Sequence, residues 1–166
     1  MNPVIDHVTE EEYLKTLGSS RDEFDNGRII RRAVTGITHG SWTVAIIEFL
    51  LNKGIVPKSE VHVIVRAGDY RIPDVLVLRP DAPREEIVMT PPEAVFEVLS
   101  PADPWDDVEA KFQDYEQMGI PIKLLLNPRT KMWKVYSGGE FRLVQTRITL
   151  NKVEIDLADI EQYVRN

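Results

Sequence analysis

Residues 71–78 read Arg-Ile-Pro-Asp-Val-Leu-Val-Leu, and residues 94–100 read Ala-Val-Phe-Glu-Val-Leu-Ser. Both segments have the apolar character of strands, and each carries one carboxylate, Asp74 and Glu97 respectively. Side chains alternate across a strand, so each carboxylate shares a face with apolar neighbours. A charge on such a face is costly to desolvate unless a cation, a proton or a donor compensates it. If the two strands are neighbours, both carboxylates point at one spot, where a hard divalent cation is the natural partner.

A predicted helix follows the second strand and supplies Lys111. We expect Asp103 as its N-cap, Pro104 as its first residue and Gly119 as its end. An acid pair with a lysine suits the hydrolysis of a phosphodiester. Asp107 precedes Lys111 by one helical turn, so it could hold the lysine in position or form an ordinary surface ion pair with it.

The other segments alternate between helix and strand signals. A capping box at residues 9–12 predicts a short helix ending at Gly18. Asn26-Gly27 predicts a hairpin whose return strand spans residues 28–34. Thr38 is the expected cap of a helix from about residue 39 to residue 53. Strands are further expected at residues 60–66 and 120–126, a hairpin at 132–146 and a closing helix at 156–164. We therefore predict a single α/β (α+β) domain over residues 1–166, with a mixed central sheet flanked by helices.

Composition limits the classes of function. The 166 residues carry a net charge of −7, which is the wrong sign for holding nucleic acid by bulk electrostatics. A local basic patch, with Arg28, Arg31 and Arg32 at its centre, would be needed; a solvated strand face is the alternative. There is no cysteine, which excludes disulfides and zinc–thiolate sites. With no membrane span or signal peptide expected, a cytoplasmic location is the default.

The ordered motifs resemble the Uma-type family, a bacterial branch of the PD-(D/E)XK nuclease superfamily usually labelled as restriction endonucleases. The resemblance covers roughly residues 9–136 and rests on three segments: residues 71–75 (Arg-Ile-Pro-Asp-Val), residues 91–101 (Pro-Pro-Glu-Ala-Val-Phe-Glu-Val-Leu-Ser-Pro) and residues 107–115 (Asp-Val-Glu-Ala-Lys-Phe-Gln-Asp-Tyr). It implies a restriction-endonuclease-like core and a Mg²⁺-dependent endonuclease acting on DNA, with Mn²⁺ able to substitute.

The resemblance also implies roles for individual residues. Metal ligands would be Asp74, Glu97 and the carbonyl of Val98, and the catalytic set would be Asp74, Glu97, Lys111 and Glu23. His39 and Arg71 would contact the substrate. In the superfamily pattern the lysine follows the second acid by two residues, where this chain has Leu99; the Uma-type pattern takes it from the next helix instead.

Two departures and three alternatives accompany this interpretation. Residues 122–124 (Ile-Lys-Leu) replace the Glu-Tyr-Trp common in the family, and Asn127 replaces an aspartate. Without the resemblance, Asp74 would be a strand-end acid paired with Arg71 or capping a loop. The chain could be a catalytically silent nuclease-fold module that binds nucleic acid or a protein partner, or a hydrolase of another phosphoester. Cutting both strands of DNA favours two symmetric sites, as in a homodimer.

Overall fold

A six-stranded mixed sheet forms the centre of the fold, in a computed structural model that describes residues 4–5, 8–17, 21–32, 35–144 and 146–165. The strand order is β11-β10-β9-β8-β7-β4. The bounds are β4 Pro57–Lys58, β7 Val75–Val77, β8 Ala94–Val98, β9 Ile122–Asn127, β10 Met132–Ser137 and β11 Glu140–Leu143. Strands β8 and β9 are parallel, whereas the other neighbours are antiparallel.

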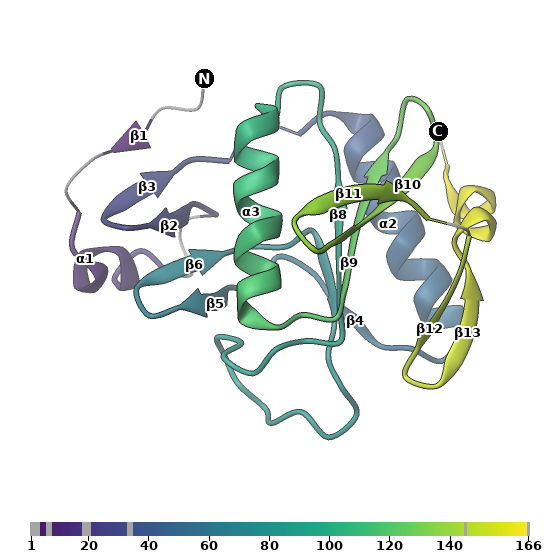
Figure 1. The fold of residues 1–166 in the computed structure, drawn as a ribbon, viewed down its shortest axis with the longest axis horizontal. Coiled ribbons are helices and arrows are strands. Elements are labelled where there is room, and N and C mark those ends of the chain that lie inside the picture. The colour runs from purple at the N-terminus through teal and green to yellow at the C-terminus, as the bar shows by residue number, and fades with distance from the viewer. Residues whose placement is uncertain (1–3, 6–7, 18–20, 33–34, 145, 166) are drawn as a thin grey trace.

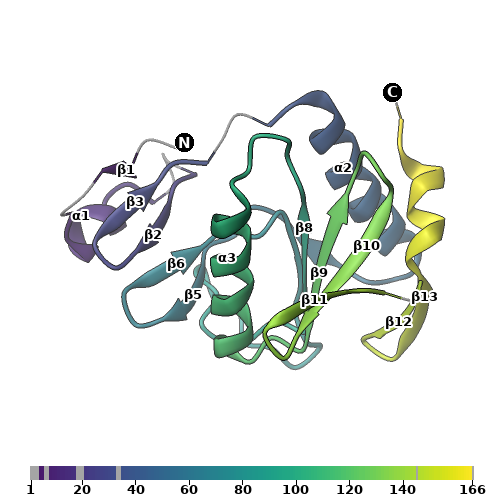
Figure 2. The same ribbon diagram turned by 45° about the horizontal axis from the view of Figure 1, so that its top comes forward.

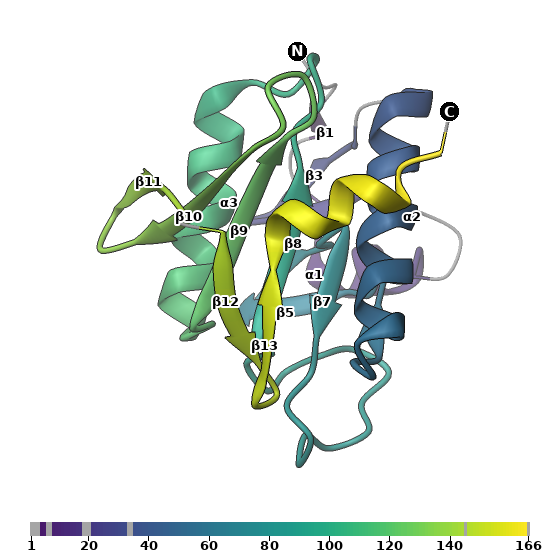
Figure 3. The same ribbon diagram turned by 90° about the vertical axis from the view of Figure 1, so that its right-hand side faces the viewer.

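One long helix covers each face of this sheet (Figure 3). Helix α3 (Trp105–Met118) connects the parallel strands β8 and β9, and helix α2 (Ile37–Asn52) lies on the opposite face. The 3₁₀ helix η1 (Leu157–Tyr163) packs against α2, with Tyr163 edge-on to Phe49. A two-stranded sheet of β12 (Arg147–Leu150) and β13 (Val153–Asp156) precedes η1. This arrangement confirms the predicted mixed sheet flanked by helices.

A second sheet, built largely from the N-terminal segments, lies beside α3 (Figures 1 and 2). Its strand order is β1-β3-β2-β6-β5. The bounds are β1 Val4–Ile5, β2 Glu23–Asp25, β3 Arg28–Ile30, β5 Val63–Arg66 and β6 Asp69–Arg71, with helix α1 at Glu10–Leu14. Tyr13, Phe24 and Tyr70 form its small aromatic core.

The chain passes from one sheet to the other at Pro73. The sequence predicts one strand over residues 71–78, but β6 ends at Arg71 and β7 begins at Val75. Proline has no backbone N–H and cannot continue a ladder in the middle of a sheet, so the segment divides there. Asp74 therefore lies at the junction of the two sheets.

Strands β7 and β8 are neighbours, as expected, and Val75 pairs with Phe96. Alternation along β8 divides the core into two parts. Phe96 packs on the α2 side of the sheet, and Val95 packs on the α3 side. Glu97 shares the α3 side, where its carboxylate reaches Tyr115 of α3. The predicted placement of Glu97 on one face with Val95 is confirmed.

Several local predictions are confirmed. The Thr9 capping box is present, and Asn26 and Gly27 have the positive φ values of 48° and 81° that a tight hairpin requires. Helix α3 ends at Gly119 in the left-handed region, with φ of 88°. Two expected ends are wrong. Helix α1 ends at Leu14, with Lys15 as its C-cap, and does not continue to Gly18, and β3 ends at Ile30 and does not continue through residues 31–32. Gly18 itself and residues 33–34 lie outside the described residues.

Other boundaries need correction. Gly36, not Thr38, is the N-cap of α2, so the helix begins two residues earlier than expected. Pro104 caps α3, because the Asp103 carboxylate instead accepts a hydrogen bond from the Ser100 amide. The β12–β13 hairpin was not predicted. No helix within the described residues is long and apolar enough to cross a lipid bilayer.

Candidate active site

A pocket of about 130 Å³ opens where α3, the amino end of α2 and the junction between the two sheets meet. Its wall includes all six side chains predicted for the site: Glu23, His39, Arg71, Asp74, Glu97 and Lys111. Val98, predicted as a metal ligand through its carbonyl, and Arg32 also line it. Residues that are 88 positions apart in the sequence, from Glu23 to Lys111, are thus brought together.

Asp74 is buried, and each of its carboxylate oxygens is engaged. Oδ1 accepts a hydrogen bond from Arg32 Nη2 at 2.5 Å. Oδ2 accepts one from the Val98 amide at 2.8 Å and lies 3.1 Å from His39 Nε2. Among the described residues Asp74 therefore pairs with Arg32, and with His39 when that ring is protonated, and not with Arg71, the partner considered from the sequence.

These neighbours determine how Asp74 and His39 ionise. Burial favours the neutral acid, but the hydrogen bond from His39 and the charge of Arg32 lower the pKa of Asp74 well below its ordinary value. Burial disfavours the imidazolium, yet the hydrogen bond to Asp74 and its charge raise the pKa of His39. The resemblance implies that His39 contacts the substrate; in the protein alone its ring contacts Asp74.

Glu97 is the acid of the site that ionises least easily. Its Oε1 accepts a hydrogen bond from Tyr115 Oη at 2.6 Å and lies 3.0 Å from Lys111 Nζ. Burial and the negative charge of Asp74 outweigh the attraction of Lys111 and raise the pKa of Glu97 to about 7. Its other oxygen, Oε2, receives no hydrogen bond from the described residues.

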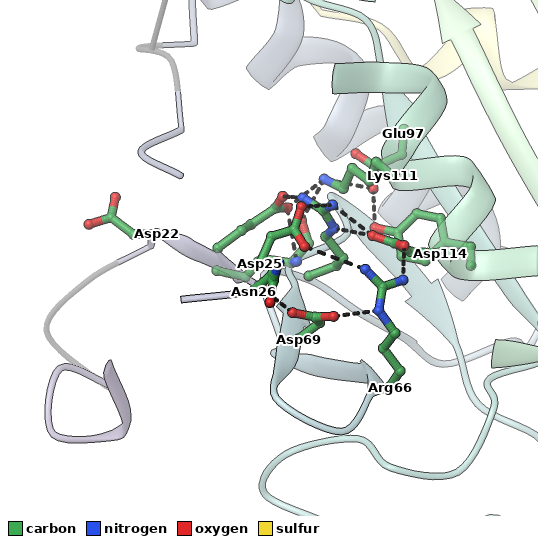
Figure 4. Close-up of polar contacts among 12 residues, drawn as sticks. Asp22, Asp25, Asn26, Arg66, Asp69, Glu97, Lys111 and Asp114 are labelled. Atoms are coloured by element: carbon green, nitrogen blue, oxygen red, sulfur yellow. Dashed lines mark hydrogen bonds and ion pairs between the residues drawn. The ribbon is translucent and has the colours of Figure 1, made fainter. Parts of the chain in front are cut away.

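Lys111 lies between two acids, as Figure 4 shows for Glu97. Its Nζ is 2.8 Å from Glu23 Oε1 and 3.0 Å from Glu97 Oε1, and it donates to the carbonyl of Ile72 at 3.1 Å. Lys111 and Asp107, both within the described residues, form no ion pair. The predicted interaction between them is therefore wrong. Asp107 is exposed to water, whereas the buried carboxylates hold the ammonium more strongly in their low-dielectric surroundings.

Glu23 is held in place from three directions. Its Oε1 accepts hydrogen bonds from the Ile72 amide and its Oε2 from Arg71 Nη1, and Lys111 is the third partner. Burial opposes ionisation, but the charges of Lys111 and Arg71 lower the pKa of Glu23 to about 2. Glu23 is therefore an ionised partner for the lysine throughout the neutral pH range.

Behind the pocket lies an ion network that the sequence analysis missed (Figure 4). The buried Arg71 guanidinium contacts Asp114 at 2.6 Å and Asp25 at 3.3 Å in addition to Glu23. Arg66 contacts Asp114 at 2.5 Å and also pairs with Asp69. Asp114 lies on α3 one turn after Lys111, so this network ties the helix that carries the lysine to the second sheet. The one sequence signal for this ion network was Asp114, an acid next to the apolar residues of α3.

The oxygen atoms that line the pocket are of the chemical type that hard cations bind. Asp74 directly precedes β7, and Glu97 lies near the end of the neighbouring strand β8. The Oε2 atom of Glu97 receives no hydrogen bond from the described residues. Hard divalent cations take oxygen ligands of this type, including main-chain carbonyls such as that of Val98. Within the described part of the chain no three His, Cys, Asp or Glu side chains form a group that could hold a metal. The site therefore offers two carboxylates, with Glu23 already committed to Lys111 and Arg71.

Comparisons with known proteins identify the family and the fold of the chain. The model of the family described as "Uma2: Putative restriction endonuclease" matches residues 10–162. A crystal structure titled as a putative nuclease belonging to DUF820, from Anabaena variabilis, superposes with a TM-score of 0.75 at 16% sequence identity. The alignment covers 95% of this chain and 99% of that one. No curated protein matches the chain.

Proposed function

The chain belongs to the Uma2 family of restriction-endonuclease-like proteins, and from this premise we propose that it is a Mg²⁺-dependent endonuclease that hydrolyses DNA phosphodiester bonds in the pocket between α3 and the two sheets. One observation carries the proposal. The Lys111 ammonium lies within 3.0 Å of Glu97, on the same pocket wall as Asp74. Two acids and a lysine around one cavity are the parts that this reaction needs.

Each side chain has a distinct part in the proposed mechanism. Asp74 and Glu97 would hold the divalent cation, with the Val98 carbonyl as a third ligand. When bound, such a cation lowers the pKa of a coordinated water and stabilises negative charge on the scissile phosphate. Lys111 orients the attacking water or stabilises the charge that develops on the phosphate oxygens. Glu23 keeps that lysine charged and aimed into the pocket.

The neighbouring cations complete the assignment. His39 lines the pocket and would contact a phosphate oxygen once Asp74 has another partner. Arg71 was predicted to contact substrate, but its guanidinium makes three carboxylate contacts and is only 4% exposed. We therefore assign Arg71 to positioning Glu23 and α3 and do not place it on the DNA.

Nicking of supercoiled plasmid in Mg²⁺ or Mn²⁺ tests the proposal. We expect Asp74→Ala and Lys111→Ala each to lower the rate by at least about a hundredfold. Lys131→Ala is the matched control, because it removes a positive charge from an exposed lysine that pairs with Glu161 and does not line the pocket. Equal nicking by all four proteins would show that the activity comes from a contaminant or from another site.

Two features favour a second candidate, a nuclease fold that binds a partner without cutting. Both oxygens of Asp74 are already engaged within the protein, and the net charge is −7. A binding module of this kind would show neither plasmid nicking nor a rise in melting temperature on adding Mg²⁺. Hydrolysis of a small phosphodiester without nicking of DNA would instead indicate another phosphoester substrate.

A further inference from the structure

Arg32 blocks the oxygen of Asp74 that a cation would need. Its Nη2 lies 2.5 Å from Asp74 Oδ1, while the Val98 amide and His39 occupy Oδ2. The Asp74 side chain is only 4% exposed. A metal ion at Oδ1 and the Arg32 guanidinium would lie close together, and the repulsion between two cations in a low-dielectric pocket disfavours their simultaneous contact with this oxygen.

Arg32 is also the arginine or lysine of the pocket that is most easily released. Lys111 contacts two carboxylates and a carbonyl, and Arg71 contacts three carboxylates. Arg32 has one carboxylate partner among the described residues, and its side chain is the most exposed of the three, at 19%. Arg32 follows the end of β3, outside any regular element, so the backbone that carries it can also shift without loss of ladder hydrogen bonds.

We propose that Arg32 is a built-in counter-ion that a divalent cation displaces from Asp74, and that the released guanidinium then binds the phosphate of the DNA. In the metal-free protein it compensates a buried carboxylate, whose charge would otherwise be costly. Once displaced, it remains at a pocket that receives an anionic substrate, and its planar fork of donors matches phosphate oxygens. This inference rests on the proposed function for the identity of the substrate, but its first step concerns metal binding alone.

Titration of the protein with Mn²⁺, without DNA, tests the displacement. We compare the wild type with Arg32→Ala and with Arg32→Gln, which keeps more of the side-chain volume if the alanine variant fails to fold. Removing the competing cation should tighten Mn²⁺ binding by about tenfold or more, equivalent to about 1.4 kcal/mol. Binding that appears only in the Arg32 variants would support the proposal equally.

Two further variants make the result specific. Arg31→Ala removes an exposed positive charge from the adjacent position and should leave the affinity for Mn²⁺ unchanged. Asp74→Asn should abolish the gain produced by Arg32→Gln, since it removes the charged ligand itself. Equal or weaker binding by the Arg32 variants, an equal gain from Arg31→Ala, or no binding by any variant would overturn the proposal.

The phosphate contact is tested at saturating Mn²⁺. Plasmid nicking by Arg32→Gln should fall by about a hundredfold despite the tighter metal binding. Opposite changes in affinity and rate are not expected of a merely structural residue. Nicking at the wild-type rate would refute the phosphate contact, whereas failure of every protein to nick DNA would refute the nuclease assignment and leave the metal titration intact as a separate result.

Discussion

Replacing Glu97 with glutamine should make the metal-free protein more stable at alkaline pH. Burial and the charge of Asp74 raise the pKa of Glu97 from 4.5 to about 7. An acid whose pKa is raised in the folded state stabilises the protein below its unfolded pKa, and this contribution is lost as pH rises through the folded pKa. The loss should therefore occur between pH 4.5 and pH 7.

The size of the effect follows from the two pKa values. Each pH unit between them corresponds to about 1.4 kcal/mol, so ionising Glu97 in the folded protein costs about 3 kcal/mol. Glutamine keeps an acceptor for the Tyr115 hydroxyl but removes one partner of Lys111, which reduces the gain. At pH 8 we expect Glu97→Gln to raise the free energy of unfolding by about 1–3 kcal/mol.

Urea unfolding in EDTA, repeated at intervals from pH 4.5 to pH 8, provides the measurement. The wild type and Glu97→Gln curves should converge near pH 4.5 and separate as pH rises. Glu86→Gln, at an exposed glutamate, is the matched control and should stay within about 0.5 kcal/mol of the wild type. Parallel wild-type and Glu97→Gln profiles would refute the reasoning, because they would show that Glu97 is no easier to protonate in the folded state.

Three further substitutions test other parts of the fold by urea unfolding. Arg71→Met should destabilise the protein by about 3–5 kcal/mol, because it leaves Glu23 and Asp114 buried with fewer cationic partners; a loss below 1 kcal/mol would argue against that role. Gly119→Ala should cost about 1 kcal/mol at its left-handed φ of 88°, whereas Gly40→Ala inside α2 should stabilise by up to about 1 kcal/mol. Changes of the same sign at both glycines would contradict the backbone argument.

The local parts of the site were predictable from the sequence. Asp74 and Glu97 are each the one carboxylate in a mostly apolar segment. Two apolar strands close together in the sequence often pair in a sheet, which would bring the two carboxylates together. Lys111 comes from the helix that begins a few residues after β8, so its approach to Glu97 depends on one short connection. Local patterns therefore indicated the two acids, whereas the choice of Lys111 also depended on the family resemblance, because Leu99 occupies the usual position of the lysine.

Glu23 and His39, which come from distant segments, were proposed from the family resemblance alone, and two ion pairs between distant segments were not predicted at all. Arg32 meets Asp74 across 42 residues, and Arg71 meets Asp114 across 43. No periodicity or motif specifies such a pair, because the pairing depends on how two sheets are placed against each other. The β12–β13 hairpin is different: Asn151 and Lys152 have φ values of 47° and 67°, and an asparagine in a turn between apolar residues was a usable signal.

The division of the chain at Pro73 also has a consequence for the order of folding. Strand β8, helix α3 and strand β9 follow one another directly, so their mutual contacts require only short loops to close. The contacts of Asp74 with Arg32 and His39, and of Glu23 with Arg71 and Ile72, join residues 35 to 49 positions apart. Contacts at such separations require more loop-closure entropy and tend to form later.

One side of the pocket comes from β8 and α3, and the other side comes from the segments that carry Glu23, Arg32 and His39. We therefore expect these two sides to meet only after the rate-limiting step of folding. In that case, substitutions at Arg32 or Arg71 will mainly accelerate unfolding, with φ-values near zero in kinetic experiments. Substitutions of core residues between β8 and α3, such as Phe112, will mainly slow folding. The pocket is then the last part of the molecule to form and the first to open.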